Sequence, residues 1–105
     1  MEEKEIDLQQ CRNQIDSIDK QMAELFETRM KVVSEVAKYK AKHGLYTYDP
    51  KRESIIKNRN KFYVSLELQE YYAAFFDNVL YLSKKYQNDL REKDENALTN
   101  PEKEM

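Results

Sequence analysis

The sequence predicts an all-α protein with three helices per chain, the first of them very long. The chain has 105 residues but one Gly and two Pro, whereas a sheet protein would need more turn-forming residues. Residues 6–43 contain neither Gly nor Pro, and apolar residues recur along them at steps of three and four, which is typical of a helix that packs along its whole length. This apolar seam consists of Leu8, Cys11, Ile15, Ile18, Met22, Leu25, Val32, Val36 and Tyr39.

The expected first helix is too long for a domain of this size. About 37 residues at about 1.5 Å each span about 55 Å, whereas a compact domain of about 100 residues has a radius of gyration of about 13 Å. Either the helix breaks or a second copy of the protein packs along it. We favour a second copy, and hence a homodimer, because no helix breaker lies between Leu8 and His43.

Composition and charge exclude several classes of partner. Charged residues make up 36% of the chain and the formal net charge is −2, so neither nucleic acid nor an anionic membrane is an expected partner. The first ten residues are acidic and polar, unlike a signal peptide. No apolar run approaches the roughly 20 residues of a membrane span. We therefore expect a cytoplasmic protein.

Cysteine and histidine are too scarce for the common metal and covalent chemistries. Cys11 lies on the seam and is interpreted as a small core residue. His43 precedes Gly44, a typical left-handed helix terminator, and its expected role is to complement the helix dipole. We expect no metal site, no cofactor and no Ser–His–Asp nucleophile. The single Gly also excludes a Gly-rich phosphate loop.

Two shorter helices and a tail should follow the first helix. Asp49-Pro50 indicates a helix start, because Asp caps a helix and Pro fits its first turn. This second helix should end around residues 63–65, and the third should run from about Leu66 to about Leu90. Residues 91–105 are charged and have little to bury, so we expect a domain at residues 1–90 and a disordered tail at 91–105.

The third helix carries two neighbouring stripes. The expected main stripe is Leu68, Tyr72, Phe75, Val79, Leu82 and Tyr86. A second row beside it is Phe76, Leu80, Ser83, Gln87 and Leu90. Two polar residues thus lie one turn apart on an otherwise apolar row. On spacing alone, a helix edge that meets water explains this row as well as a functional site does.

Basic residues on the first helix are candidates for a binding site. Arg29 interrupts the apolar seam, and a buried guanidinium needs a partner or a ligand, because burying it unpaired is very costly. Lys40 shares the face of Arg29, about 20° round and about 16 Å along the axis. Arg12 lies about 25 Å from Arg29, too far to reach the same small molecule. In an antiparallel dimer, Arg12 of one chain can approach Arg29 of the other.

The other candidates lie on the second and third helices. Arg52 and Glu53 follow Asp49 by one turn, although a capping Asp beside ion-paired neighbours would explain them without any function. Together with Ser83 and Gln87, the candidates provide cations, carboxylates, a hydroxyl and an amide. That set suits a small di-anion carrying hydroxyls, and a reaction driven by positioning and electrostatics.

Three blocks of residues within about residues 6–90 stand out by their order and spacing. The first block is Arg12-x-x-Ile15-x-x-Ile18-Asp19, then Leu25-x-x-x-Arg29, then Val33-x-x-Val36-x-x-x-Lys40. The second block is Asp49-x-x-Arg52-Glu53, and the third is Ser83-x-x-x-Gln87. Each block alone is a weak signal, whereas together, in this order and spacing, they are highly specific. Over about residues 6–90 the sequence resembles the all-helical, AroQ-type chorismate mutases.

The resemblance implies an intertwined helical homodimer with two active sites and no cofactor. It implies an isomerase that converts chorismate to prephenate by a Claisen rearrangement, on the shikimate-pathway route to the aromatic amino acids phenylalanine and tyrosine. Each site would use Arg12 of the partner subunit and the remaining residues of its own chain.

The resemblance also implies a role for each site residue. Arg12 and Arg29 would hold the two carboxylates of the substrate. Lys40 and Gln87 would hydrogen-bond the ether oxygen whose bond breaks. The ring hydroxyl would contact Glu53 and the region of Asp49. Arg52 and Ser83 would complete the polar shell. The expected catalytic residues are Arg29, Lys40, Glu53 and Gln87.

Two alternatives stay open at this point. An isochorismate-pyruvate lyase of the same fold would have a similar cationic pocket, although the Arg52-Glu53 pair and Gln87 favour the mutase. A non-catalytic helical dimerisation module would explain the seam, but not Arg29, Lys40 and Gln87 together. The sequence is equally compatible with a chain that acts alone and with one in a complex with another shikimate-pathway enzyme.

Overall fold

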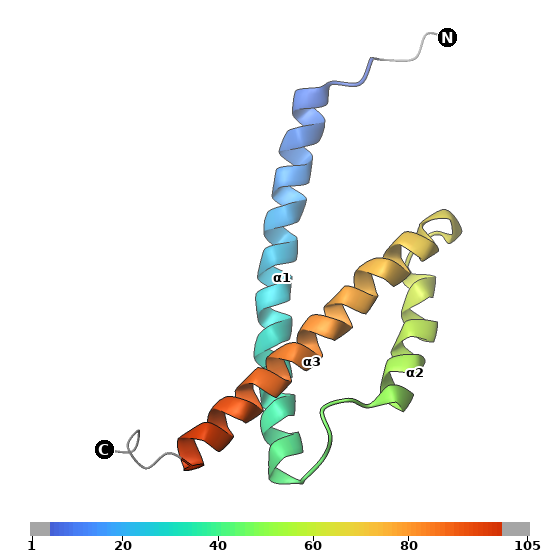
Figure 1. Cartoon of the computed structure of the whole chain (residues 1–105). Coiled ribbons are helices and arrows are strands. Elements are labelled where there is room, and N and C mark those ends of the chain that lie inside the picture. The colour runs from blue at the N-terminus through green and yellow to red at the C-terminus, as the bar shows by residue number, and fades with distance from the viewer. Residues whose placement is uncertain (1–4, 100–105) are drawn as a thin grey trace. The chain divides into compact units, whose positions relative to one another are not determined.

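The computed structural model describes residues 5–99, and three α-helices dominate them (Figure 1). Helix α1 is Leu8–Lys42, α2 is Pro50–Asn60 and α3 is Gln69–Thr99. Two short 3₁₀ turns, Lys61–Tyr63 and Leu66–Leu68, join α2 to α3. No strand occurs within residues 5–99. The all-α fold class and the three helices predicted from the sequence are confirmed.

Local signals set both ends of α1. The backbone N–H of Gln10 donates to Asp7 Oδ1 at 3.2 Å, which caps the N-terminus. At the other end Gly44 adopts a φ of 64°, and the N–H of Leu45 donates to the carbonyl of Lys40 at 2.8 Å. A side chain at position 44 would be strained in this left-handed conformation, so Gly terminates the helix as the sequence predicts.

The chain divides within α1 into two compact units, Met1–Val32 and Val33–Met105. In the first unit, the large apolar side chains of the predicted seam are exposed: Leu8, Ile15, Ile18, Met22, Leu25 and Val32. In the second unit, α1 buries Val33 and Ala37, whereas Val36 and Tyr39 stay exposed. The predicted seam is therefore not the face of α1 that packs within this chain. Its apolar surface remains available to another surface.

The start of α2 follows the predicted cap. The N–H of Arg52 donates to Asp49 Oδ1 at 3.0 Å, and Pro50 occupies the first turn, where its missing N–H costs nothing. Helix α2 ends at Asn60, earlier than the predicted end at residues 63–65, because the chain tightens there into the 3₁₀ turn Lys61–Tyr63.

The core of the second unit lies between α2 and α3. Ile56 of α2 packs against Phe76 and Leu80 of α3, with Tyr72 and Val79 partly buried beside them. The rings of Tyr72 and Phe76 stack with centroids 5.7 Å apart. Phe75 and Leu82 of the expected main stripe are exposed within this chain, whereas Phe76 and Leu80 of the second row are buried. The second row faces the core instead, because it is the row that Ile56 meets.

A surface ion pair also links α2 to α3. Lys57 Nζ lies 2.9 Å from Asp77 Oδ1. The pKa of Lys57 is raised above its ordinary value of 10.5, chiefly by this side-chain hydrogen bond. A raised lysine pKa stabilises the fold below pH 10.5, and that contribution is lost only as the pH rises through the higher folded-state pKa. The contribution of this pair to the stability of the fold therefore does not change with pH near neutrality.

Helix α3 ends later than predicted, at Thr99 rather than near Leu90. Residues 91–99 contain no Gly or Pro, and six of the nine (one Arg, two Glu, one Lys, one Ala and one Leu) favour helix even where little can be buried. Arg91 Nη2 also donates to the carbonyl of Leu45 at 2.8 Å, which ties this part of the helix to the α1–α2 connection. Residues 100–105 of the expected tail lie outside the described residues, and the domain boundary at residue 90 stays a prediction.

The small core gives a first testable expectation. Leu80 is buried in the cluster with Ile56 and Phe76. Leu80→Ala should lower the free energy of unfolding by about 2–5 kcal/mol, because it removes buried methyl groups and leaves a cavity. The same change at Leu66, which is exposed, is the control and should have little effect. Urea unfolding at one fixed protein concentration measures both. Equal losses at the two positions would contradict this assignment of the core.

Candidate active site

The two arginines expected to hold a di-anion lie in the first unit, on α1. Arg12 is exposed and Arg29 is half-buried. Both belong to the stretch of α1 whose apolar seam is exposed. The other six candidates, Lys40, Asp49, Arg52, Glu53, Ser83 and Gln87, all lie in the second unit.

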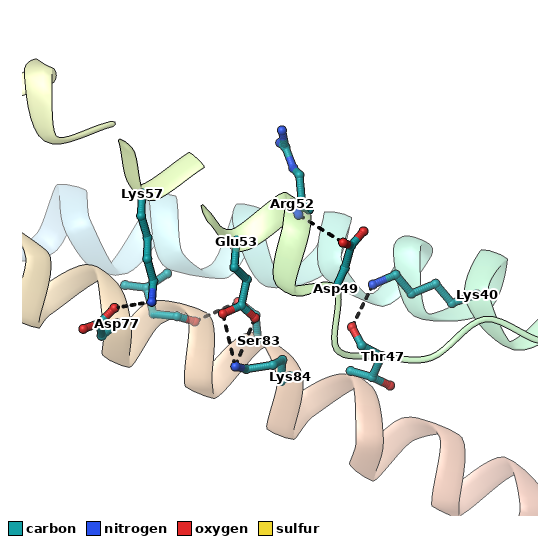
Figure 2. Close-up of polar contacts among 10 residues, drawn as sticks. Lys40, Thr47, Asp49, Arg52, Glu53, Lys57, Asp77, Ser83 and Lys84 are labelled. Atoms are coloured by element: carbon teal, nitrogen blue, oxygen red, sulfur yellow. Dashed lines mark hydrogen bonds and ion pairs between the residues drawn. The ribbon is translucent and has the colours of Figure 1, made fainter. Parts of the chain in front are cut away.

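Lys40 lies in the last turn of α1 and is half-buried. Its Nζ donates to the carbonyl of Thr47 at 2.8 Å, two residues before the cap of α2 (Figure 2). The early end of α1 at Gly44 turns the chain so that this carbonyl comes within reach. An ammonium has three N–H donors, so one bond to Thr47 leaves others for a ligand.

Asp49 and Arg52 open α2, and their side chains are exposed. The carboxylate of Asp49 accepts from the backbone of Arg52, while the guanidinium of Arg52 points away from Glu53 (Figure 2). The capping role predicted for Asp49 is thus confirmed. The interpretation of Arg52 and Glu53 as ion-paired neighbours is not, because Glu53 pairs with a lysine of α3.

Glu53 reaches from α2 to Lys84 on α3. Lys84 Nζ lies 3.0 Å from Glu53 Oε2 and 3.3 Å from Oε1, and the two side chains are 31% and 15% exposed (Figure 2). The same ammonium lies over the ring of Tyr48, 4.7 Å from its centroid, in cation–π contact. Sequence reasoning missed Lys84, although its position four residues after Leu80 and three before Gln87 places it beside the buried row of α3.

Ser83 and Gln87 are buried polar residues on α3, only 5% and 7% exposed. Ser83 Oγ donates to the carbonyl of Val79 at 2.8 Å. Gln87 Oε1 is buried without a hydrogen-bond partner among the residues that the structure describes. The interpretation of this row as a helix edge that meets water is therefore wrong.

The second unit thus positions two ammonium groups, a carboxylate, a hydroxyl and an amide from three elements. Lys40 comes from α1, Glu53 from α2, and Ser83, Lys84 and Gln87 come from α3. Within residues 5–99, no group of three His, Cys, Asp or Glu side chains could hold a metal ion, and no helix is long and apolar enough to cross a membrane. Such a set can bind an anion and stabilise charge that develops on an oxygen atom.

Most of the chain matches one family of known proteins. The family model described as chorismate mutase type II matches residues 11–88. A T-protein of Haemophilus influenzae is 46% identical over 46 residues, which cover 44% of this chain and 12% of that protein. A T-protein of Enterobacter agglomerans is 41% identical over 56 residues, which cover 52% of this chain and 15% of that protein.

The chain therefore matches only a small part of the length of these curated relatives. No solved structure matches the chain closely enough to be called a relative. The family match, in contrast, extends from Cys11 to Asn88 and so includes all eight predicted site residues. This chain belongs to the chorismate mutase type II family.

Proposed function

We propose that this chain converts chorismate to prephenate in the biosynthesis of phenylalanine and tyrosine. The observation that carries the proposal is Gln87, a buried amide whose Oε1 has no hydrogen-bond partner among residues 5–99. Leaving a buried polar atom unpaired costs about 1–3 kcal/mol, so its presence calls for an explanation. A ligand that pairs with this amide would provide one.

The chemistry of the amide suits the ether oxygen of chorismate. Rotation of the Gln87 amide by a half-turn exchanges Oε1 and Nε2, so the same buried position can present an N–H donor. The rearrangement is unimolecular, and negative charge grows on the ether oxygen as its bond to carbon breaks. A neutral donor and the ammonium of Lys40 would stabilise that charge more in the transition state than in bound chorismate.

The remaining candidates complete the proposed site. Arg29, with Arg12 of the partner subunit, would hold the two carboxylates and select the compact conformer that rearranges. Glu53 and the Asp49 region would contact the ring hydroxyl. Arg52 and Ser83 would complete the polar shell. The reaction needs neither a nucleophile nor a metal ion, because binding and charge stabilisation supply the catalysis.

We also propose that the chain is an intertwined homodimer. The support is the exposed seam of α1, where apolar side chains from Leu8 to Tyr39 lie unburied by their own chain. A second copy covering this seam would remove that apolar area from water. Sedimentation at micromolar concentration should give about twice the chain mass, as for a two-fold symmetric dimer. A folded, fully active monomer would contradict the dimer.

Product identification tests the proposed reaction. Purified protein should convert chorismate to prephenate, identified by nuclear magnetic resonance, without release of pyruvate. The parallel incubation with isochorismate separates the mutase from a lyase of the same fold. Pyruvate release from isochorismate, with no prephenate formed from chorismate, would overturn the proposal in favour of the lyase.

A further inference from the structure

We propose that Lys84 is a positioning residue for the mutase reaction, which aims the carboxylate of Glu53 and offsets its negative charge where a di-anionic substrate binds. The inference rests on the proposed function and goes beyond it, because Lys84 is none of the eight residues that the family resemblance marks. Lys84 contacts residues of two other elements of the second unit, so that the α1–α2 connection, α2 and α3 meet at its ammonium.

The ammonium of Lys84 is placed to fix the orientation of the Glu53 carboxylate. Lys84 Nζ contacts both oxygens of Glu53, at 3.0 and 3.3 Å, while the ring of Tyr48 covers the ammonium from another side. The Glu53 side chain is 15% exposed. The α2–α3 pair of Lys57 and Asp77 is far more solvated, with side chains 45% and 57% exposed. Limited contact with water makes the charge interaction of Glu53 with Lys84 the stronger one.

The contact between Lys84 and Glu53 would reduce charge repulsion in the proposed site. Glu53 carries a negative charge in a site whose substrate carries two, so alone it would repel the ligand it must contact. An ionised carboxylate offers about four lone-pair positions. Lys84 engages one on each oxygen, and the others can accept from a ring hydroxyl. The ammonium thereby offsets the charge and fixes the direction of the carboxylate.

The charged and titratable groups around Glu53 come from several elements. Lys84 of α3 and Tyr48 of the connection form the contacts described above. On α2, Lys57 is near enough for attraction to Glu53 to help raise the pKa of that lysine. The guanidinium of Arg52 points away from Glu53 (Figure 2). Among these groups, Lys84 is thus the cation whose removal should most change the direction and the uncompensated charge of the Glu53 carboxylate.

The test is a double-mutant cycle on steady-state kinetics with chorismate. Lys84→Met should lower kcat/KM about tenfold, within the coupling expected for residues of one salt-bridge network. The loss should be mainly a higher KM, because repulsion of the di-anion acts on the bound substrate and the transition state alike. In a Glu53→Gln background, the same change should alter kcat/KM less than about twofold, since no charge remains to be offset. Lys84→Arg should largely preserve the wild-type KM.

Lys57→Met is the matched control, because it breaks an ion pair that also links α2 and α3. It should leave KM and kcat close to wild type. Thermal unfolding of all variants separates a structural effect from a positioning effect. If Lys84→Met fails to fold, Lys84→Gln takes its place in the same cycle.

Each outcome decides the inference separately from the proposed function. A wild-type chain that forms no prephenate would overturn both. An active wild type in which Lys84→Met changes nothing would overturn the role of Lys84 alone. The role of Lys84 would also be overturned if Lys84→Met lowers kcat/KM by the same factor in the wild-type background and in the Glu53→Gln background. A rise in KM that depends on Glu53 and is rescued by Arg would support it.

Discussion

Arg12→Ala and Arg29→Ala proteins, each nearly inactive alone, should recover up to about one quarter of the wild-type rate when their subunits are exchanged within a symmetric dimer. In the mixed dimer, one site combines the intact Arg29 of one chain with the intact Arg12 of the other. The second site lacks both. Random exchange makes about half of all dimers mixed, each with one working site, which sets this limit.

Arg29→Ala mixed with Lys40→Ala provides the control. Both residues are proposed to serve the site of their own chain, so every site in that mixed dimer lacks one of them. The mixture should stay at the level of its parents. Exchange itself is followed by mass spectrometry of differently tagged chains. Demonstrated exchange without recovery in the Arg12 and Arg29 mixture would show that Arg12 does not act in the partner's site.

Gln87→Glu should give an enzyme whose kcat falls as the pH rises, while the wild type stays comparatively flat. A protonated carboxyl can donate a hydrogen bond to the ether oxygen, whereas a carboxylate cannot and would repel the charge growing there. Lys40 and the arginines would lower the pKa of the introduced carboxyl, and burial and the anionic substrate would raise it. Gln87→Ala, which removes the donor at every pH, should lower kcat by about 10²–10³-fold.

The measurement is a pH profile of kcat from about pH 4.5 to 8, the range in which a perturbed glutamic acid titrates. Gln69→Glu is the matched control, because it places the same carboxyl at the start of the same helix. Its profile should follow the wild type. Wild-type rates for Gln87→Glu across the whole range would show that Gln87 is not the donor to the ether oxygen.

Local signals made two helix bounds predictable, the end of α1 and the start of α2. Gly44 ends α1 through its own backbone conformation, and Asp49 starts α2 through one hydrogen bond to a residue three positions on. Neither feature depends on a distant partner. The end of α3 was predicted too early. The charge of residues 91–99 and their small apolar content suggested a disordered tail, although their helix propensity favours a helix that reaches Thr99.

The packing face of α3 depends on long-range contacts, and spacing alone did not predict which of its two rows packs against α2. Both rows of α3 are apolar enough to form a core, and the choice between them comes from where Ile56 of α2 meets the helix. Spacing alone also left open whether Ser83 and Gln87, which lie further along the same row, are buried. Lys84 was missed because a surface lysine is unremarkable until its carboxylate partner on another helix is known.

The site residues were predicted from their types and spacing and from the family resemblance, and both their membership of the site and their roles stay predictions. The structure shows the pairing of Glu53 with Lys84, the bond from Lys40 to Thr47 and the buried amide of Gln87. The proposed entry of Arg12 into a partner's site would require a second chain. A sequence pattern can indicate such sharing only through the length and the exposed seam of α1.

The most direct test of the central claim is the rate of chorismate loss with purified wild-type protein, in a buffer containing a metal chelator, beside Gln87→Ala and beside buffer alone. We expect prephenate to form at least about 10⁶-fold faster than in buffer, as is typical of an enzyme. The chelator should have no effect, and Gln87→Ala should lose about 10²–10³-fold of this rate. Chorismate loss at the rate of buffer alone, from a folded protein, would contradict the claim that this site catalyses the rearrangement.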